Sequence, residues 1–444
     1  MFWTVEPAYK AHRQLQCEKR MKLILPGIRQ KIKALHSLTW RYRKIMPLLL
    51  FLLMIPVYYN SISAHFNTVY GYRCFFDSDG EFILHQFDMN KTFTHNDHLL
   101  YHVIARWRYT HAGLLPNPLK IHKQLSAIAG AAGVALLFAI GLSLTGRILP
   151  SLLAALFTGG CAGYWFFAAT IDTYQPSLVF CILSLGFFIK ALQRQRLADY
   201  AGMGAAMGMA FLFRTDAVLL GTLALIALAA ARRRTAGLVV CGGLFLIVGV
   251  AGYAVLAHHY YNVPWHQIPA WTAGHANRPE TLQGQWGTLH NFTGAALGIT
   301  ALNHALYAIL IPGVNATRDA GFLSTPAGIT ALVIYILTAG TALLRGAWKS
   351  RQDRLVFCLL MAAVTWLVTR VFFYCWWDPK APFLFAVLSL PAWWLILIMS
   401  IGRKTTSAPQ PAAGSRWETL ALALLTITAW SHNTINLVQP LRHL

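Results

Sequence analysis

Runs of about twenty hydrophobic residues recur along the chain and alternate with shorter polar segments. Hydrocarbon offers no hydrogen-bond partners to a bare backbone, so each run predicts an α-helix that spans a bilayer. We therefore expect an all-α, polytopic membrane bundle. The eleven predicted spans are 46–65, 125–145, 149–169, 175–193, 200–213, 217–231, 236–257, 326–344, 355–375, 383–401 and 417–436.

Basic residues sort the connecting segments into two sides. Lys and Arg are concentrated before residue 46 and in short links such as 232–234 and 345–354, and links of this kind stay in the cytoplasm. The N-terminus is thus expected inside, and the long loops 66–124 and 258–325 outside. An apolar stretch at 293–312 is interpreted as an interfacial or re-entrant helix, because an extra span there would move 345–354 outside.

This topology divides the chain into three parts. Residues 1–45 form a basic cytoplasmic segment, 46–401 the transmembrane domain, and 402–444 a linker with a final span. The composition agrees with an integral membrane protein, because 56% of residues are hydrophobic and 12% are charged. The net charge of +22 comes from Lys and Arg concentrated before residue 46 and in short links beside the spans, which favours contact with membrane lipids and argues against a nucleic-acid partner.

Acidic residues are scarce, and several fall just after the first span. Asp77, Asp79 and Glu81 lie between aromatic residues. Carboxylates at a membrane surface are costly unless they bind a cation, accept hydrogen bonds or take a proton. Neighbouring carboxylates push each other's pKa apart, which suits one of them to act as a general base. The alternative is a solvated turn that caps the following helix.

Several histidines follow the acidic residues in the same predicted outer loop. On a helix His98 and His102 share a face, with His95 one turn earlier, a spacing that can hold a metal. His is frequent in both outer loops, so coincidence is the competing interpretation. A divalent cation is the only cofactor indicated. Its candidate ligands are Asp79, Glu81, His98 and His102.

Further charged residues stand where hydrocarbon is expected, and such residues usually line a cavity or pair with one another. Arg106 can hold a phosphate or anchor the chain at the interface. Structural pairs, Arg214 with Asp216 or Arg370 with Asp378, are the alternative to a substrate role. The positions in question are Arg106, Asp172, Arg214, Asp216, Arg370, Asp378 and Lys380.

The order of these features resembles the polytopic glycosyltransferases of the GT-C fold, the group of protein O-mannosyltransferases and aminoarabinose transferases. The similarity is to a bacterial branch with Asp-x-Gly-Glu-Phe after the first span. Gly80-Glu81-Phe82, Leu100-Tyr101 and the run from Gly208 to Arg214 keep that frame, as does Trp377-Asp378-Pro379. Ser78 takes the place of the family's first acid, so Asp77 or Asp79 lies one residue out of frame.

The resemblance implies an enzyme of the bacterial inner membrane with an extracytoplasmic active site. Its donor would be a polyprenyl-phosphate-linked sugar, and its acceptor a hydroxyl of a glycan, lipid or protein. A first-loop carboxylate, Asp79 before Asp77 or Glu81, would be the base, and Arg or Lys would neutralise the departing phosphate. The expected substrate-binding residues are His95, His98, Tyr101, Arg106, Asp172, Arg214, Arg370, Asp378 and Lys380.

Three other functions compete with this one. A transporter or flippase of lipid-linked glycans would spread polar residues through mid-span positions, whereas here they gather at the outer ends. A glycan polymerase or ligase usually carries its large loop late in the chain. A zinc-dependent hydrolase would depend on His95, His98 and His102.

Overall fold

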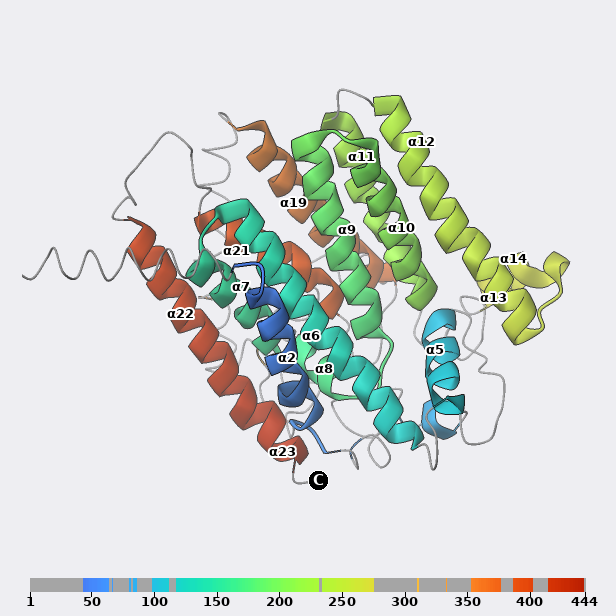
Figure 1. Cartoon of the computed structure of the whole chain (residues 1–444), viewed down its shortest axis with the longest axis horizontal. Helices are drawn as coiled ribbons and strands as arrows, with labels where there is room; N and C mark the ends of the chain where they lie inside the picture. Colours follow the sequence, from blue (N-terminus) through green and yellow to red (C-terminus); the bar gives the residue numbers. More distant parts are fainter. Residues whose placement is uncertain are drawn as a thin grey trace, which may run out of the picture. The chain divides into compact units, whose positions relative to one another are not determined.

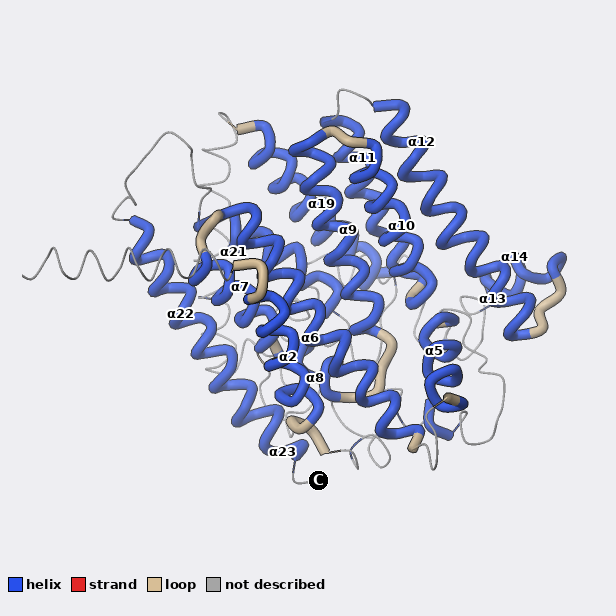
Figure 2. The backbone as a smooth tube through the Cα atoms, viewed as in Figure 1, coloured by secondary structure: helices blue, strands red, loops and turns tan. Residues whose placement is uncertain are grey.

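The computed structural model of the protein describes residues 43–63, 66, 80, 83–85, 98–111, 117–230, 234–274, 310, 333, 353–376, 386–401 and 414–442. These ranges are helical and contain no strand (Figures 1 and 2). Residues 50–444 form one compact unit, and residues 1–49 form another.

Every predicted span except 326–344 overlaps one or more described helices, and apart from single residues, 326–344 and 293–312 lie outside the described residues. Among the described helices, Pro118–Thr145, Tyr174–Arg194 and Thr235–Tyr261 are each long and apolar enough to cross a membrane, and a bent pair adds a fourth. The bounds are α2 Met46–Tyr59, α5 Leu99–Thr110, α6 Pro118–Thr145, α7 Ile148–Gly160, α8 Ala162–Ala169, α9 Tyr174–Arg194, α10 Leu197–Phe213, η1 Thr215–Leu220, α11 Gly221–Ala230, α12 Arg234–Phe245, η2 Leu246–Ala251, α13 Gly252–Tyr261, η3 Trp265–Gln267, α14 Ile268–Gly274, α19 Arg354–Trp376, η5 Ala386–Ser389, α21 Leu390–Ile401, α22 Gly414–Asn433, η6 Thr434–Val438 and α23 Gln439–Arg442.

Helix α6 has clear start and stop signals in its sequence. The Asn117 side chain accepts a hydrogen bond from the Lys120 N–H at 3.2 Å, and Pro118 occupies the first turn, where its missing N–H is not needed. Gly146 ends the helix with φ 66°, a conformation that favours glycine. The predicted span began at 125, so the helix starts earlier than expected and includes His122.

The predicted span 149–169 is two helices. α7 and α8 meet at an angle of 68°, and Cys161 between them is extended, with φ −61° and ψ 140°. Hydropathy alone cannot reveal such a break, because the residues on both sides of it are equally apolar. The short helix α8 then leads into the 170–173 turn before α9.

Side chains from other helices satisfy the carbonyls exposed by this break. The Tyr58 hydroxyl of α2 donates to the Gly159 carbonyl at 3.0 Å, and Asn433 of α22 donates to the Gly160 carbonyl at 2.8 Å. Trp430 of α22 donates to a carbonyl one turn earlier, also at 2.8 Å. A bare carbonyl in a membrane costs several kcal/mol, so α2 and α22 make the break tolerable.

Small residues bring α10 into backbone contact with α12 and with η2, which directly follows α12. A Cβ added at Gly204 would lie 2.1 Å from the Cys241 carbonyl oxygen, and one at Gly208 would lie 2.7 Å from the Gly249 nitrogen. Such close approach is typical of membrane helix pairs. On its other side α10 packs along α9 (Figure 1), so that the end of α10 lies beside the start of α9.

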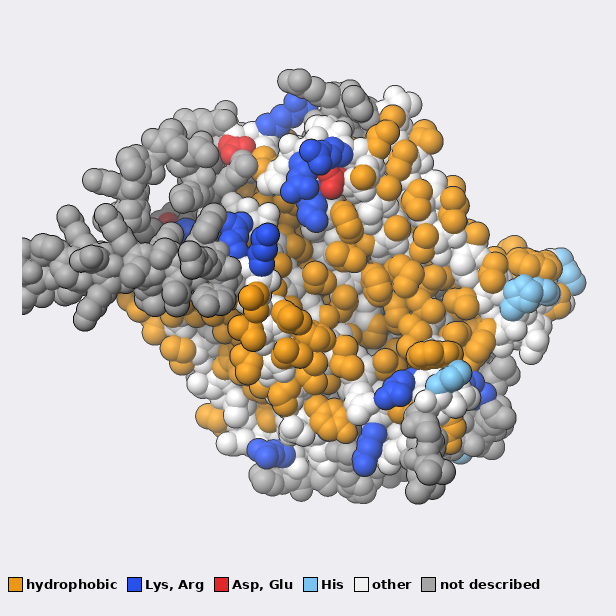
Figure 3. All heavy atoms as spheres, in the orientation of Figure 1, with side chains coloured by type: hydrophobic (Ala, Val, Ile, Leu, Met, Phe, Trp, Pro, Cys, Tyr) orange, Lys and Arg blue, Asp and Glu red, His pale blue; other side chains and the backbone are white. Residues whose placement is uncertain are grey.

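Hydrophobic side chains cover the middle of the face shown in Figure 3, with Lys and Arg toward its margins. Several large apolar residues of the helices are well exposed, including Leu53, Leu225 and Ile247, at 66%, 65% and 65%. Surfaces of this kind are compatible with lipid rather than water. The described bundle is therefore organised as an integral membrane protein.

Candidate functional site

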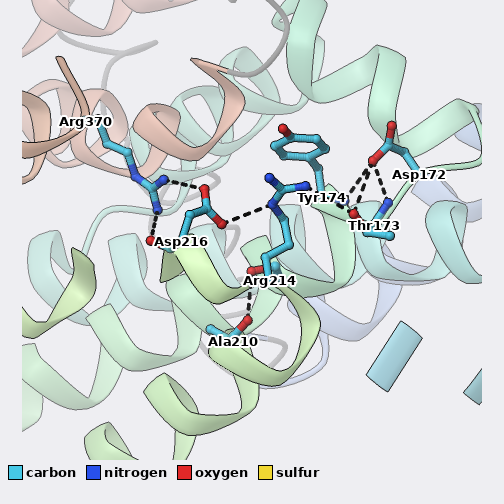
Figure 4. A network of polar contacts seen from close by, with 8 residues as sticks. Asp172, Thr173, Tyr174, Ala210, Arg214, Asp216 and Arg370 are labelled. Atoms are coloured by element: carbon cyan, nitrogen blue, oxygen red, sulfur yellow. Dashed lines mark hydrogen bonds and ion pairs between the residues drawn. The ribbon is translucent and has the colours of Figure 1, made fainter. Parts of the chain in front are cut away.

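Arg214 is the centre of a buried polar network at the end of α10 (Figure 4). Its Nε donates to Asp216 Oδ1 at 3.1 Å, and its Nη1 donates to Thr173 Oγ1 at 3.3 Å. The guanidinium also stacks over the Tyr174 ring, 3.7 Å from the ring centroid. Three directions of contact therefore hold this side chain in one orientation.

Asp216 is shared by two guanidiniums. Arg370 Nη1 donates to its Oδ2 at 2.8 Å, and Arg370 Nη2 donates to its backbone oxygen at 3.4 Å. The Arg370 side chain is 1% exposed and that of Asp216 9%, a depth at which charges persist only when they are paired. The contact between Arg214 and Asp216 that the sequence suggested is confirmed. For Arg370 the partner found is Asp216, 154 positions away, whereas Asp378 lies outside the described residues.

Asp172 caps the start of α9 within the same network. Its Oδ1 accepts hydrogen bonds from the backbone N–H groups of Thr173 at 2.6 Å and Tyr174 at 3.4 Å. A carboxylate at a helix N-terminus is stabilised by these donors and by the helix dipole. The Thr173 hydroxyl accepts from Arg214 and lies 3.5 Å from the same Asp172 oxygen, so the network runs from α19 to the start of α9.

Tyr101 connects the predicted first outer loop to the helices of the charged network. It lies on α5, is 1% exposed, and its hydroxyl forms a hydrogen bond of 3.1 Å with His122 Nδ1 on α6. Burial, and then the negative charge of Asp172, raise the pKa of Tyr101 far above its ordinary value. The phenol therefore stays neutral at physiological pH and holds α5 against α6.

Apolar packing joins the same loop to the charged network. Ile83 and Leu84 belong to one buried cluster with Ile171, Leu212 and Phe213. Ile171 directly precedes Asp172, and Phe213 directly precedes Arg214. The segment that follows the acidic stretch therefore shares one buried cluster with the residues that immediately precede Asp172 and Arg214.

The remaining predicted site residues are only partly within the described chain. His98, the N-cap residue of α5, and His102, one turn later, are both buried, and Arg106 on that helix lies near Tyr260 and Tyr261. Within the described ranges no three His, Cys, Asp or Glu side chains come together as metal ligands, and the cation remains a prediction. Outside the described residues lie Asp77, Asp79, Glu81, His95, Asp378 and Lys380.

His122 had no predicted role, and Asp216 was predicted either to line a cavity or to pair with Arg214. Each left a signal, because a histidine at the start of an apolar run and an acid two residues from an arginine are both unusual in a membrane helix. Their partners were not predictable in this way. His122 contacts Tyr101 and Asp216 contacts Arg370 because the fold packs helices together that are distant in sequence.

Comparison with known proteins adds two findings. Residues 123–259, from α6 through most of α13, match the family described as dolichyl-phosphate-mannose-protein mannosyltransferase. The fold is similar to that of ArnT from Cupriavidus metallidurans, a crystal structure with bound undecaprenyl phosphate. That match has a TM-score of 0.51 and 12% sequence identity, and covers 90% of this chain and 77% of ArnT. The fold is that of the GT-C glycosyltransferases.

The two matches together indicate a glycosyltransferase, in agreement with the motif resemblance. The family match covers less than half of the chain, but it includes Asp172, Arg214 and Asp216. A search of curated proteins found no match. The GT-C fold accounts for the helical architecture.

Proposed function

We propose that this protein transfers a sugar from a polyprenyl-phosphate-linked donor to an acceptor hydroxyl on the extracytoplasmic face of the bacterial inner membrane. The observation that carries the proposal is the buried cluster of Ile83 and Leu84 with Ile171 and Phe213. Ile171 and Phe213 directly precede Asp172 and Arg214 in the sequence, so this cluster joins the segment after the acidic stretch to the segments that carry a buried carboxylate and a buried guanidinium. A carboxylate and a phosphate-binding cation are the two groups that such a transfer needs.

The first-loop acids supply the base. Asp79 and Glu81 are covalently joined to Gly80, which is buried. In the proposed step a carboxylate, Asp79 first and Asp77 second, takes the proton of the acceptor hydroxyl while the hydroxyl oxygen attacks the anomeric carbon. The bond from that carbon to the phosphate oxygen breaks, and the polyprenyl phosphate leaves with the electron pair. Glu81 orients the acceptor or raises the pKa of its neighbour.

Arg214 receives the departing phosphate, assisted by Arg106 or Arg370. A planar guanidinium stabilises phosphate charge through paired donors, and the Asp216, Thr173 and Tyr174 contacts orient it in advance. A polyprenyl phosphate as donor carrier is supported by ArnT, whose structure holds undecaprenyl phosphate. The acceptor is a hydroxyl of a glycan, lipid or protein.

The test is transfer of labelled sugar from polyprenyl-phosphate donors to a membrane extract. Asp79→Asn should lower the transfer rate by about 10²- to 10⁴-fold, the usual loss when a general base is removed, with expression unchanged. Loss in Asp77→Asn instead would shift the base by two residues and leave the mechanism intact. Full activity in Asp79→Asn, Asp77→Asn and Glu81→Gln alike would refute the glycosyltransferase proposal. Movement of the intact donor across the bilayer without a transferred product would instead indicate a flippase.

A further inference from the structure

We infer that Lys123 of α6 is a positioning residue for the acids of the first loop. It holds the chain where that chain leaves α2, and so fixes one end of the segment that carries the proposed base. This inference rests on the proposed function and adds a residue outside the charged network around Arg214.

The backbone changes partners at the end of α2. The Ser61 N–H still donates to a carbonyl of α2, at 3.3 Å. One residue later the partners come from other elements. The Lys123 ammonium donates to the Ile62 carbonyl, and the Ser63 N–H donates to the Leu441 carbonyl of α23 at 3.0 Å. Helices α6 and α23 therefore direct the chain after α2.

Lys123 is committed to this contact. Its side chain is 5% exposed, and its Nζ lies 5.4 Å from the centroid of the Tyr59 ring, near the end of α2. A buried ammonium is costly unless its donors are used, and a carbonyl and an aromatic face both compensate it. Lys120, one turn earlier, is exposed, as expected of a lysine that reaches for water at a membrane surface. The burial of Lys123 indicates a different role, which is to hold the end of α2.

The acids lie between two buried anchors in the sequence. Before them, Phe66 is 0% exposed and meets the Phe166 ring of α8 edge-on, with centroids 5.8 Å apart. After them, Ile83 belongs to the buried cluster that includes the residues next to the charged network. Asp77 and Asp79 fall between these anchors. A chain fixed at both ends has fewer conformations than one fixed at a single end, so the first anchor raises the chance that a carboxylate meets the acceptor hydroxyl.

This role predicts a selective loss of turnover. Lys123→Met keeps a side chain of similar length and removes the ammonium. Its kcat should fall on the order of 10- to 100-fold, since misplacement of a reacting group has an effect of that size. Its KM for the polyprenyl-phosphate donor should stay within about twofold of the wild type, because the base acts at the chemical step. Lys123→Arg keeps a charged donor and should recover kcat to within a few-fold. Lys120→Met, which removes a lysine from the same end of α6, is the matched control and should transfer sugar normally.

Hydrogen exchange tests the anchor without using activity. It is measured on the purified full chain in detergent, together with melting temperature. In Lys123→Met the amides of residues 60–66 should exchange on the order of tenfold faster than in the wild type, because their local opening becomes easier. The amides of α9 and α10 should exchange as in the wild type, and Lys120→Met should match the wild type throughout. Faster exchange along the whole bundle would mean general destabilisation and would overturn the inference.

The two measurements separate the possible failures. If the wild type transfers no sugar from polyprenyl-phosphate donors, the proposed function is wrong, and exchange alone then decides whether Lys123 holds the end of α2. If the wild type is active, the positioning role is overturned by a wild-type kcat in Lys123→Met, by a loss confined to KM, or by unchanged exchange at 60–66. Should Lys123→Met lack a melting transition, Tyr59→Leu takes its place, because it removes only the aromatic face. It should speed exchange in the same segment and lower kcat by a few-fold, and unchanged exchange there would refute the anchor.

Discussion

Replacement of Arg214 by Lys keeps the positive charge and removes the planar donor set. An ammonium can retain the contact to Asp216, which Arg214 now makes at 3.1 Å, but it cannot also reach the Thr173 hydroxyl or stack flat on Tyr174. The hydrogen bond contributes about 0.5–1.5 kcal/mol and the stacked contact about 1–2 kcal/mol. If this orientation serves phosphate recognition, kcat/KM should fall by about 10- to 100-fold in Arg214→Lys.

The assay is sugar transfer at several concentrations of the polyprenyl-phosphate donor, with melting temperature measured on the same preparation. Arg147→Lys is a close control, because Arg147 also contacts a threonine hydroxyl, at 3.2 Å, and a carboxylate, at 4.0 Å. Both substitutions can lower the melting temperature, but only Arg214→Lys should weaken use of the donor. Equal kcat/KM in Arg214→Lys and the wild type would refute the reasoning and leave Arg214 as a structural ion-pair partner.

Three further predictions concern packing and topology. Tyr101→Phe removes the hydrogen bond between α5 and α6 and should lower the free energy of unfolding by about 1–2 kcal/mol, seen as a lower melting temperature and slower transfer. Gly204→Ala forces a Cβ against backbone and should cost about 1–3 kcal/mol, whereas Gly242→Ala, with nothing within 4 Å, should not destabilise. A single cysteine at Gly284 should react with an impermeant reagent from outside and one at Ser350 should not; labelling at Ser350 would make 293–312 a true span.

Helix positions were the most predictable part of the fold. The hydrocarbon thickness imposes a minimum length on each apolar run, so long runs reveal helices. The predicted span 175–193, for example, corresponds to α9, Tyr174–Arg194. The break at Cys161 was not predictable in this way, because it depends on carbonyl partners supplied by Tyr58 and Asn433. Those residues lie more than a hundred positions away on either side of the break, and no local pattern reports them.

The candidate site was predictable as a set of residue types but not as a set of pairs. Arg214 and Arg370 were identified because guanidiniums are rare in apolar runs. Sequence proximity suggested Asp378 for Arg370, and the contact found is with Asp216. Residues close in sequence are easily assigned to each other, whereas burial favours whichever carboxylate the helix packing brings near. The roles of Asp77, Asp79 and Glu81 stay predictions.

The capping of the α7 break also bears on how the protein is made. The hydrogen bonds from Trp430 and Asn433 come from α22, which is synthesised 274 and 273 positions after the α7 carbonyls that these two side chains contact. Until α22 inserts, those carbonyls lack their final partners. A nascent chain that stops short of α22 would therefore expose a polar defect in the lipid, a mark by which membrane quality control could recognise an unfinished protein.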